Sequence, residues 1–472
     1  MTAAALALVA GCAEPSGEIA TDEASAELGT VHGLSAEYFR GSTPDPRNRV
    51  LARIEPNIDA RWGLGAPDPA VPADQFAARW TGTIEPRFSE RYTLSLPRVD
   101  DTARVLIDGV VVIDHAGWLS PTSGTVTLQR GQPHALVVEY AEGWGVAELA
   151  LAWQSASQGL EIVPSSQLTP APTPPAQPQA GPGGRAYPHA ACTLTQRPVW
   201  WNDDLTYWVL EPASPAPVSA PLVVFDHGWM GNAPSFYAQW IEHLCRRGNV
   251  VVFPKYQSLL TLPMFFVPNA VWSVHDALAF LATPGHVHPQ TELGMVLVGH
   301  SAGGTVAANM ADTWQANALP FPRAMFAVEP AVDSVVPFTA LDHIPATTAV
   351  ACLVGNEDTV VGRGGCDTIF DRATQVPGKR YVWAFSDDHG TPGLVADHFA
   401  PSEGGYTDAL DYFLIWKLTD AMRDCAFAST SCGLAPRTLG TWSDGTPMAP
   451  ATVTLDAKPA CPAGSTAIGC AP

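Results

Sequence analysis

Two patterns of apolar and polar positions divide the chain near its middle. Residues 33–169 carry short runs in which apolar and polar residues alternate, as in strands with one buried face. Asp-Gly and Arg-Gly turns separate these runs, which lie at 91–96, 103–108, 110–113, 135–140 and 147–153. The pattern predicts an all-β sandwich.

The second half carries strands of a different kind, apolar on both faces as in buried parallel sheets. They lie at 221–225, 250–253, 295–298, 324–328, 349–354 and 381–385. Runs with helical periodicity, such as Ala270–Leu281 and Thr305–Trp314, separate them. The second half is therefore predicted to be doubly wound α/β with a mostly parallel sheet.

A proline-rich segment marks the boundary between these halves. Seven prolines and three glycines fall between Pro170 and Pro188, and such a segment is extended and buries no core of its own. We therefore assign 33–169 to the sandwich, 170–190 to a linker, 191–432 to the α/β domain and 433–472 to a C-terminal extension. The linker predicts that the sandwich positions the α/β domain without taking part in its chemistry.

The N-terminus predicts export. The apolar run Ala3–Ala10 is shorter than the roughly 20 residues that span a bilayer. It leads into Leu8-Val9-Ala10-Gly11-Cys12, which resembles a bacterial lipobox with Cys12 as the lipidated residue. We expect a signal peptide over 1–11, a flexible tether over 12–32, and a protein lipid-anchored in the cell envelope or secreted. The alternative is an ordinary signal peptide with a chance cysteine. No later segment is expected to be long and apolar enough to span a membrane.

Composition and charge narrow the possible partners. Of 472 residues, 46% are hydrophobic and 15% charged, which excludes a wholly disordered chain. With 25 Lys+Arg against 46 Asp+Glu, the formal net charge is −21. A polyanion would be repelled, so nucleic acid is excluded as a partner recognised by bulk charge.

The cysteines agree with an oxidising compartment. Nine cysteines are present, and all except Cys12 lie after the linker. Proximity in sequence favours the pairs Cys352–Cys366, Cys425–Cys432 and Cys461–Cys470, and leaves Cys192 to pair with Cys245. The number of cysteines alone permits other pairings. Their spacing does not indicate a structural zinc site.

Three segments of the first half carry a resemblance. Gly33-Leu34-Ser35-Ala36-Glu37-Tyr38-Phe39, Phe76–Gly82, and Asp100-Asp101 before Val105–Gly109 occur in the order typical of the protective-antigen-type β-sandwich. The resemblance implies that Asp100 and Asp101 match a carboxylate pair that holds Ca²⁺ in sugar-binding members, where the ion bridges to sugar hydroxyls. The alternative is that the two residues cap a turn. Trp118 and Trp144 are candidates for stacking on a glycan, or for packing.

The second half carries a nucleophile motif. Gly299-His300-Ser301-Ala302-Gly303 fits G-x-S-x-G, between a predicted strand and a predicted helix, which is the context of a nucleophile elbow. Ser301 is the predicted nucleophile. The backbone amides of Ala302 and of Trp229, which follows an earlier strand, are the predicted oxyanion hole. His227 is expected to brace that loop.

The acid and the base follow in chain order. Asp358, in Gly355-Asn356-Glu357-Asp358, ends a strand and is the predicted acid, with Glu357 and Asp333 as alternatives. His389, close to the strand ending at Phe385, is the predicted base, with His398 as the alternative. The domain resembles cutinase-like and dienelactone-hydrolase-like esterases. In the cutinase-like proteins the catalytic His precedes Phe-Ala-Pro, as His398 does here.

These features predict an exported serine esterase with a Ser-His-Asp triad and a β-sandwich for targeting. No cofactor is expected for catalysis, and Ca²⁺ is a candidate ligand of the sandwich. The expected partners are an ester substrate, a glycan and, through Cys12, a membrane. The alternatives are a glycan-binding or adhesion lipoprotein with an inactive hydrolase domain, and a serine peptidase on the same fold.

Overall fold

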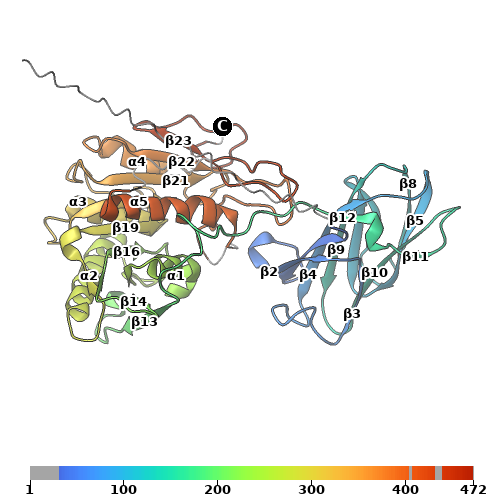
Figure 1. The fold of residues 1–472 in the computed structure, drawn as a ribbon, viewed down its shortest axis with the longest axis horizontal. Helices are drawn as coiled ribbons and strands as arrows, with labels where there is room; N and C mark the ends of the chain where they lie inside the picture. The colour runs from blue at the N-terminus through green and yellow to red at the C-terminus, as the bar shows by residue number, and fades with distance from the viewer. Residues whose placement is uncertain (1–30, 403–406, 431–437, 471–472) are drawn as a thin grey trace, which may run out of the picture.

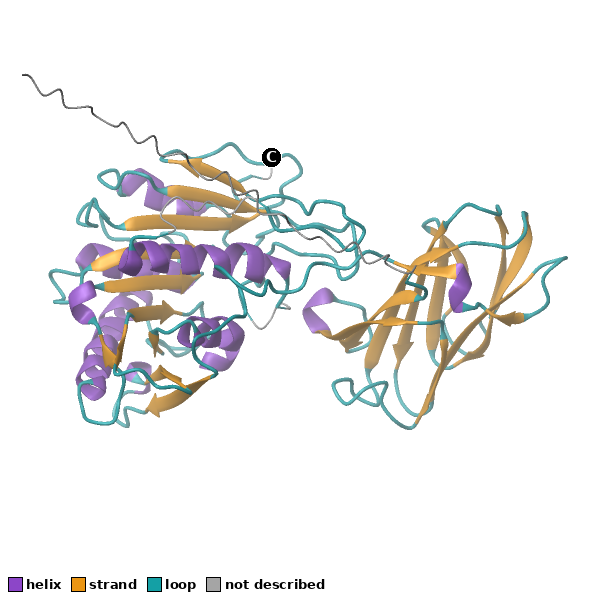
Figure 2. Ribbon diagram, viewed as in Figure 1, coloured by secondary structure: helices purple, strands orange, loops and turns teal. Residues whose placement is uncertain are grey.

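The computed structural model describes residues 31–402, 407–430 and 438–470. Two domains lie side by side, and the end of the sandwich that carries β2 is turned toward the α/β domain (Figure 1). The sandwich consists of strands joined by loops and by short 3₁₀-helical turns, whereas longer helices flank the sheet of the second domain (Figure 2). The predicted fold class of both halves is confirmed.

Two antiparallel sheets form the sandwich. The larger has the order β2-β1-β4-β9-β6-β7, with β12 also paired to β4: β1 (Leu34–Arg40), β2 (Arg49–Glu55), β4 (Phe76–Ile84), β6 (Thr102–Ile107), β7 (Val110–His115), β9 (His134–Glu142) and β12 (Leu168–Pro170). The smaller has the order β11-β10-β5-β8, with β3 also paired to β10: β3 (Asp59–Gly63), β5 (Glu90–Val99), β8 (Ser123–Leu128), β10 (Ala147–Gln154) and β11 (Glu161–Ile162). The inward-facing aromatic side chains of Trp80, Tyr92 and Trp153 are fully buried between the sheets.

A nine-stranded sheet forms the centre of the second domain, in the order β13-β14-β17-β16-β19-β20-β21-β22-β23. The six strands from β17 to β22 are parallel, and the three at the edges are antiparallel. The strands are β13 (Ala191–Arg197), β14 (Tyr207–Ala213), β16 (Leu222–Asp226), β17 (Val250–Pro254), β19 (Met295–His300), β20 (Pro322–Val328), β21 (Ala349–Gly355), β22 (Arg380–Ala384) and β23 (Thr452–Leu455). A separate two-stranded pairing joins β15 (Ser219–Ala220) to β18 (His288–Pro289).

Helices cover both faces of this sheet because its strands are apolar on both sides. One face packs against α2 (Phe266–Leu281), α3 (Ala302–Thr313) and α4 (Gly364–Arg372), and the other against α1 (Ala238–Arg246) and α5 (Trp416–Ala428). Alternate residues of β16 pack into the two cores. Leu222 and Val224 pack on the side of α2, α3 and α4, whereas Val223 and Phe225 pack on the side of α1 and α5.

Among the described residues, one helical segment, Pro263–Leu281, is long and apolar enough to cross a bilayer by length and composition, with a mean hydropathy of 1.2. The expectation that no segment after the N-terminus reaches this limit is therefore wrong. Ala270, Val274 and Ala277 are fully buried in the core that this helix shares with the sheet. The segment thus packs as a core helix of the hydrolase domain.

The C-terminal extension is part of the second domain, which the sequence did not predict. Strand β23 pairs with β22 and completes the sheet. Further on, the amide of Ile468 donates to the carbonyl oxygen of Asp358, and the hydroxyl of Ser465 donates to that of Asn356. The extension therefore supports the loop that carries the predicted acid.

Candidate active site

Ser301 lies on a sharp turn between β19 and α3. Its φ of 54° and ψ of −123° are unfavourable for a residue with a side chain, and such strain is typical of a nucleophile elbow. A Cβ on Gly299 would lie 2.1 Å from the carbonyl oxygen of Gly303, and one on Gly303 would lie 2.0 Å from that of Asp226. The two glycines therefore permit the close approach of helix and strands that the turn requires. Ser301 is 7% exposed.

His398 joins the predicted nucleophile to the predicted acid. Its Nε2 lies 2.9 Å from Oγ of Ser301, and its Nδ1 lies 3.1 Å from Oδ2 of Asp358. Nδ1–H donates to the carboxylate, which leaves Nε2 to accept the serine proton. The prediction of His389 for this position is wrong, and the alternative, His398, occupies it.

The reason lies in the loop after β22. The backbones of Asp387 and Leu394 pair in both directions, at 2.9 and 2.8 Å, and so close off a short excursion of the chain. His389 lies on this excursion, where its Nε2 is 2.8 Å from Oδ2 of Asp444. The chain returns to the sheet at Ala396, whose carbonyl accepts from the amide of Glu357, and His398 follows at once.

Asp358 is held as an ionised acceptor. Burial raises its pKa, but the hydrogen bond and charge of His398 and the amides of Val360 and Val361 outweigh burial, so the pKa lies below its usual range. Among the described residues, neither alternative acid is hydrogen-bonded to His398: Asp333 forms an ion pair with Arg372, and Glu357 lines a cavity that His398 also lines. Among the acids weighed from the sequence, the geometry selects Asp358.

The predicted oxyanion donors come from two segments, the start of α3 and the loop after β16. Ala302 begins α3, so its amide has no acceptor within the helix, and Trp229 follows β16. Within the described ranges, neither amide makes a hydrogen bond to the protein. His227 braces this loop as expected: its Nδ1 and Nε2 lie 2.6 Å from the carbonyl oxygens of Gly228 and Lys255. Burial lowers its pKa to about 4.

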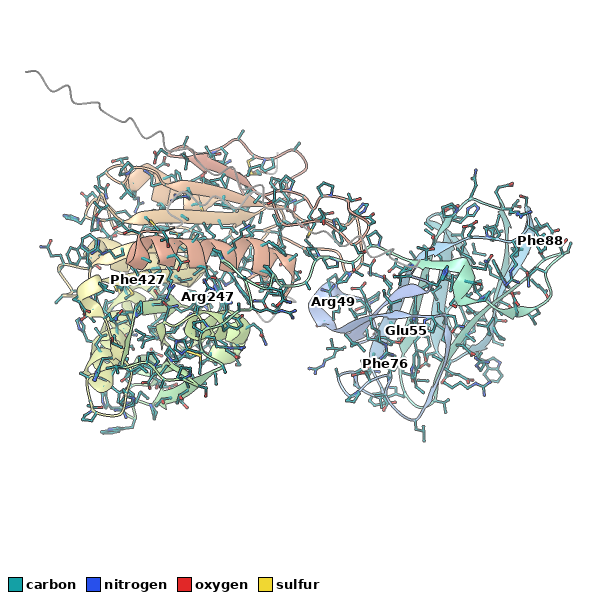
Figure 3. All side chains as sticks on the ribbon, viewed as in Figure 1. Arg49, Glu55, Phe76, Phe88, Arg247 and Phe427 are labelled. Carbon is teal, nitrogen blue, oxygen red and sulfur yellow. A yellow bond between two sulfur atoms is a disulfide. The ribbon has the colours of Figure 1, made fainter. Side chains whose placement is uncertain are left out.

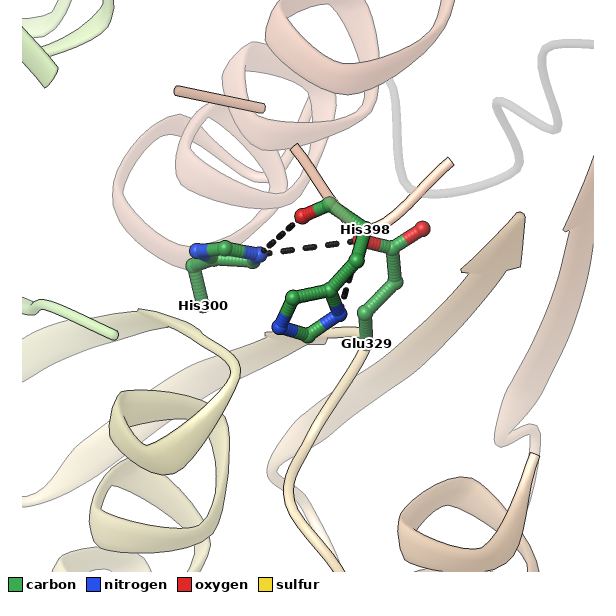
Figure 4. Close-up of side chains that lie close together, drawn as sticks. All are labelled: His300, Glu329 and His398. Atoms are coloured by element: carbon green, nitrogen blue, oxygen red, sulfur yellow. Dashed lines mark hydrogen bonds and ion pairs between the residues drawn. The ribbon is translucent and has the colours of Figure 1, made fainter. Parts of the chain in front are cut away.

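Two residues beside the triad were missed by the sequence reasoning. His300 and Glu329 lie against His398 (Figure 4), and the ligand atoms of the three lie within 4.8 Å of one another. These residue types suit a metal ion, but the nitrogens that face Glu329 have other partners. His300 Nε2 lies 2.8 Å from the carbonyl oxygen of His398, and His398 Nδ1 faces Asp358. The arrangement therefore fits a hydrogen-bond network rather than a metal centre.

Glu329 is a buried carboxyl group. Its Oε2 lies 3.7 Å from Nδ1 of His398, and its Oε1 accepts from the amide of Gly355. Burial, and then the charge of Asp358, raise its pKa well above the usual range, which favours the neutral form of this side chain beside Asp358. One signal could have found it: Glu329 follows β20, the strand next to the nucleophile strand.

The sandwich brings together a carboxylate cluster at one end of its larger sheet. Ligand atoms of Asp100, Asp101 and Glu142 lie within 4.8 Å of one another. The amide of Gly143 donates to Oδ2 of Asp101 at 2.6 Å. Glu142, which the sequence reasoning missed, is 0% exposed and its Oε1 has no hydrogen-bond partner. Burial raises the pKa of Glu142, and the charges of Asp101 and Asp100 raise it further.

Exposed tryptophans lie on loops at the same end. Ala103 pairs with His115 and Thr102 with Ala141, so the loops after β7 and β9 flank the Asp100–Asp101 turn. Trp118 and Trp144, which these loops carry, are 92% and 75% exposed. Neither ring is therefore core packing.

Three predicted disulfides are present: Cys192–Cys245, Cys352–Cys366 and Cys461–Cys470. Cys425 is also disulfide-bonded, and its predicted partner, Cys432, lies outside the described residues. Cys12 and the predicted signal peptide and tether, up to residue 30, lie outside them as well. The disulfides indicate an oxidising, non-cytoplasmic environment.

The fold and the site define a two-domain hydrolase architecture, and comparisons with known families agree. A PA14 domain matches residues 30–167, and an alpha/beta hydrolase fold matches residues 223–363. The chain therefore consists of a PA14 sandwich followed by an α/β hydrolase domain.

Individual relatives match the sandwich. The anti-sigma-I factor RsgI3 of Acetivibrio thermocellus is 40% identical over 144 residues, which are 30% of this chain and 22% of that protein. The chain thus spans about a fifth of its curated relative. An anti-sigma factor domain-containing protein from Clostridium clariflavum is 31% identical, with a TM-score of 0.29, over 34% of this chain and 53% of that one. A second protein of that description is 29% identical, with a TM-score of 0.29, over 38% and 68%.

Proposed function

We propose that this protein is a serine hydrolase that cleaves carboxylic esters. The observation that carries the proposal is the placement of His398, within hydrogen-bond reach of both Ser301 and Asp358. His398 takes the proton of Ser301 as its hydroxyl attacks the ester carbonyl. It then gives the proton to the leaving alcohol, and an acyl-enzyme remains. Water, activated by the same imidazole, releases the acid.

The amides of Trp229 and Ala302 receive the negative charge that develops on the carbonyl oxygen. One such preorganised donor contributes about 3 kcal/mol to transition-state stabilisation. Ionised Asp358 stabilises the imidazolium that forms in the same step. In the proposed mechanism, the proton transfers and the charge stabilisation are thus all carried out by groups of this chain.

We favour ester hydrolysis over peptide hydrolysis. Peptidases on this fold usually carry a large cap or propeller domain over the site, whereas the described part of this α/β domain carries neither. Export as a lipoprotein through Cys12 is part of the proposal, and the disulfides support the export but do not bear on the lipid anchor. The relatives' anti-sigma designation is not extended to this chain, because the match with RsgI3 covers only 30% of it.

A second function is proposed for the sandwich, namely Ca²⁺-dependent glycan binding. Unpartnered, buried Oε1 of Glu142 supplies a third carboxylate beside Asp100 and Asp101. Three carboxylates suit a hard cation better than two. Trp118 and Trp144 offer exposed rings for stacking on a sugar.

The test of the hydrolase proposal is Ser301→Ala. The substitution should lower kcat on p-nitrophenyl acetate by roughly 10⁴–10⁶-fold in a folded protein. A fluorophosphonate probe should label the parent and not the variant. Equal labelling of both proteins, or a parent that neither reacts with the probe nor cleaves the ester, would refute the proposal.

A further inference from the structure

The linker fixes the two domains close together instead of separating them. Within three residues it bonds to both: the amide of Ala171 donates to Thr81 of the sandwich, and the carbonyl oxygen of Pro172 accepts from Thr391 of the hydrolase domain at 2.7 Å. Thr173 then exchanges hydrogen bonds with Ser443 in both directions, each at 3.0 Å. So short a connection leaves little freedom between the domains.

A cavity of about 270 Å³ lies where the domains meet, beside the proposed base. His398, Val360 and Phe399 line it from the hydrolase domain, and Pro46 and Arg49 line it from the sandwich. The side chain of Arg49 is buried and forms an ion pair with Glu37 at 2.9 Å. It lies at the end of the sandwich that faces the hydrolase domain (Figure 3). The sandwich therefore forms a wall of the cavity that His398 lines.

A second cavity, of about 430 Å³, extends the first along the domain boundary. The two share five lining residues: Pro46, Arg49, Glu357, Gly393 and Val395. The second continues past Arg79 and Glu139 on the sandwich and along the loop from Ser386 to Val395, which leads to His398. Together they form one elongated groove, of a size typical of ligand sites.

We propose that this interdomain groove binds a neutral, hydroxyl-rich polymer, an acylated polysaccharide, and presents its ester to Ser301. The inference rests on the proposed esterase function. It makes the sandwich part of the substrate site, whereas the sequence of the linker predicted that the sandwich only positions the hydrolase domain.

The lining carries the chemistry of this choice. The second cavity is lined by four carboxylates and two guanidinium groups: Glu37, Glu139, Glu357, Asp388, Arg49 and Arg79. Hydroxyl groups both donate to carboxylates and accept from guanidinium groups. An anionic polymer would meet an excess of negative charge. A long acyl chain would cover charged groups along much of its length, and it has no hydrogen-bonding groups to replace the water that these groups would lose.

The test is binding without turnover, in the full chain carrying Ser301→Ala, with neutral acetylated xylan oligosaccharides measured by calorimetry. EDTA is present so that the Asp100–Asp101 loops do not contribute through Ca²⁺. Arg79→Gln together with Glu139→Gln removes both members of an ion pair, and we expect binding to weaken at least about tenfold. The matched control is Arg87→Gln with Glu161→Gln, a similar pair elsewhere on the sandwich, which should change binding less than about twofold.

Kinetics in the Ser301 background give the second readout. The groove variant should lower the ratio of kcat/KM on acetylated xylan to kcat/KM on p-nitrophenyl acetate by a similar factor. Equal binding by the groove variant and the control, or an absence of binding by the parent, would overturn the groove even if p-nitrophenyl acetate is cleaved. Selective loss of binding in the groove variant would uphold it even if the esterase proposal failed.

Discussion

Nε2 of His300 lies 2.8 Å from the backbone carbonyl oxygen of His398, so the residue before the nucleophile holds the residue proposed as base. Nδ1 of His300 lies 2.8 Å from the hydroxyl of Tyr237, which accepts from the amide of Gly228. Burial, and then the charge of His398, lower the pKa of His300 to about 3. A neutral ring with one donor and one acceptor matches both contacts. One network thus joins the oxyanion loop to the base.

Tyr237→Phe should therefore lower kcat with little effect on KM. The substitution leaves the Gly228 amide and His300 Nδ1 without partners, which costs about 1–3 kcal/mol in a buried site. We expect kcat on p-nitrophenyl acetate to fall about tenfold or more. Tyr187→Phe is the matched control, because Tyr187, in the linker, also contacts a histidine of the hydrolase domain, Nδ1 of His243 at 2.9 Å, away from the triad. If both variants lose only stability, the network has no role in positioning.

The two histidines of the loop after β22 give a paired prediction. His398→Ala removes the imidazole that contacts Ser301, and kcat should fall by roughly 10⁴–10⁶-fold. His389→Ala removes a surface contact with Asp444, and kcat should stay within about twofold. The measurement is steady-state turnover of p-nitrophenyl acetate by folded variants. An inactive His389 variant beside an active His398 variant would contradict the proposed triad.

Strand patterns predicted the α/β core because each buried strand is a local apolar run. The elbow was predictable for the same reason, since Gly299 to Gly303 follows one strand and opens one helix. The base was not, because the distance along the chain from β22 does not reveal that Asp387 and Leu394 pair and exclude His389. Glu142 was missed because β9 brings it beside Asp101 only in the folded sheet, and Glu329 was missed because its place after β20 does not by itself reveal the approach to His398.

Glu329→Gln and Asp358→Asn should separate the two carboxyl groups near His398. Gln imitates the neutral Glu329, so kcat should stay within a few-fold, whereas Asp358→Asn should cost roughly 10⁴-fold, as loss of a triad acid does. Equal losses in both variants would show that Glu329 works as an ionised partner.

The same pair predicts opposite effects of pH on stability. Glu329 has a raised pKa, so above about pH 4.3 the unfolded chain ionises it while the folded protein keeps its proton, and this group lowers stability as pH rises. Glu329→Gln should then raise Tm at pH 8, by roughly 2–4 °C per kcal/mol, and leave it unchanged at pH 4. Asp358 has a lowered pKa, and the stability it contributes is lost as pH falls through that value. A pH-independent gain in Glu329→Gln would exclude the ionisation explanation.

Calcium should raise the Tm of the sandwich if Asp100, Asp101 and Glu142 bind it. Binding of Ca²⁺ to the folded state alone stabilises that state by mass action, by about 2.7 kcal/mol at a concentration 100 times Kd.

Asp101→Asn separates Ca²⁺ binding from a turn-capping role. Asn tolerates the positive φ of 50° at this position, and its side-chain oxygen still accepts from Gly143, but the charge is lost. The variant, like Glu142→Gln, should fold normally and lose the shift in millimolar Ca²⁺. Asp114→Asn, at an exposed site on β7, should keep it. A shift that persists in both site variants would place the ion elsewhere, and no shift in the parent would leave Asp101 as a turn cap.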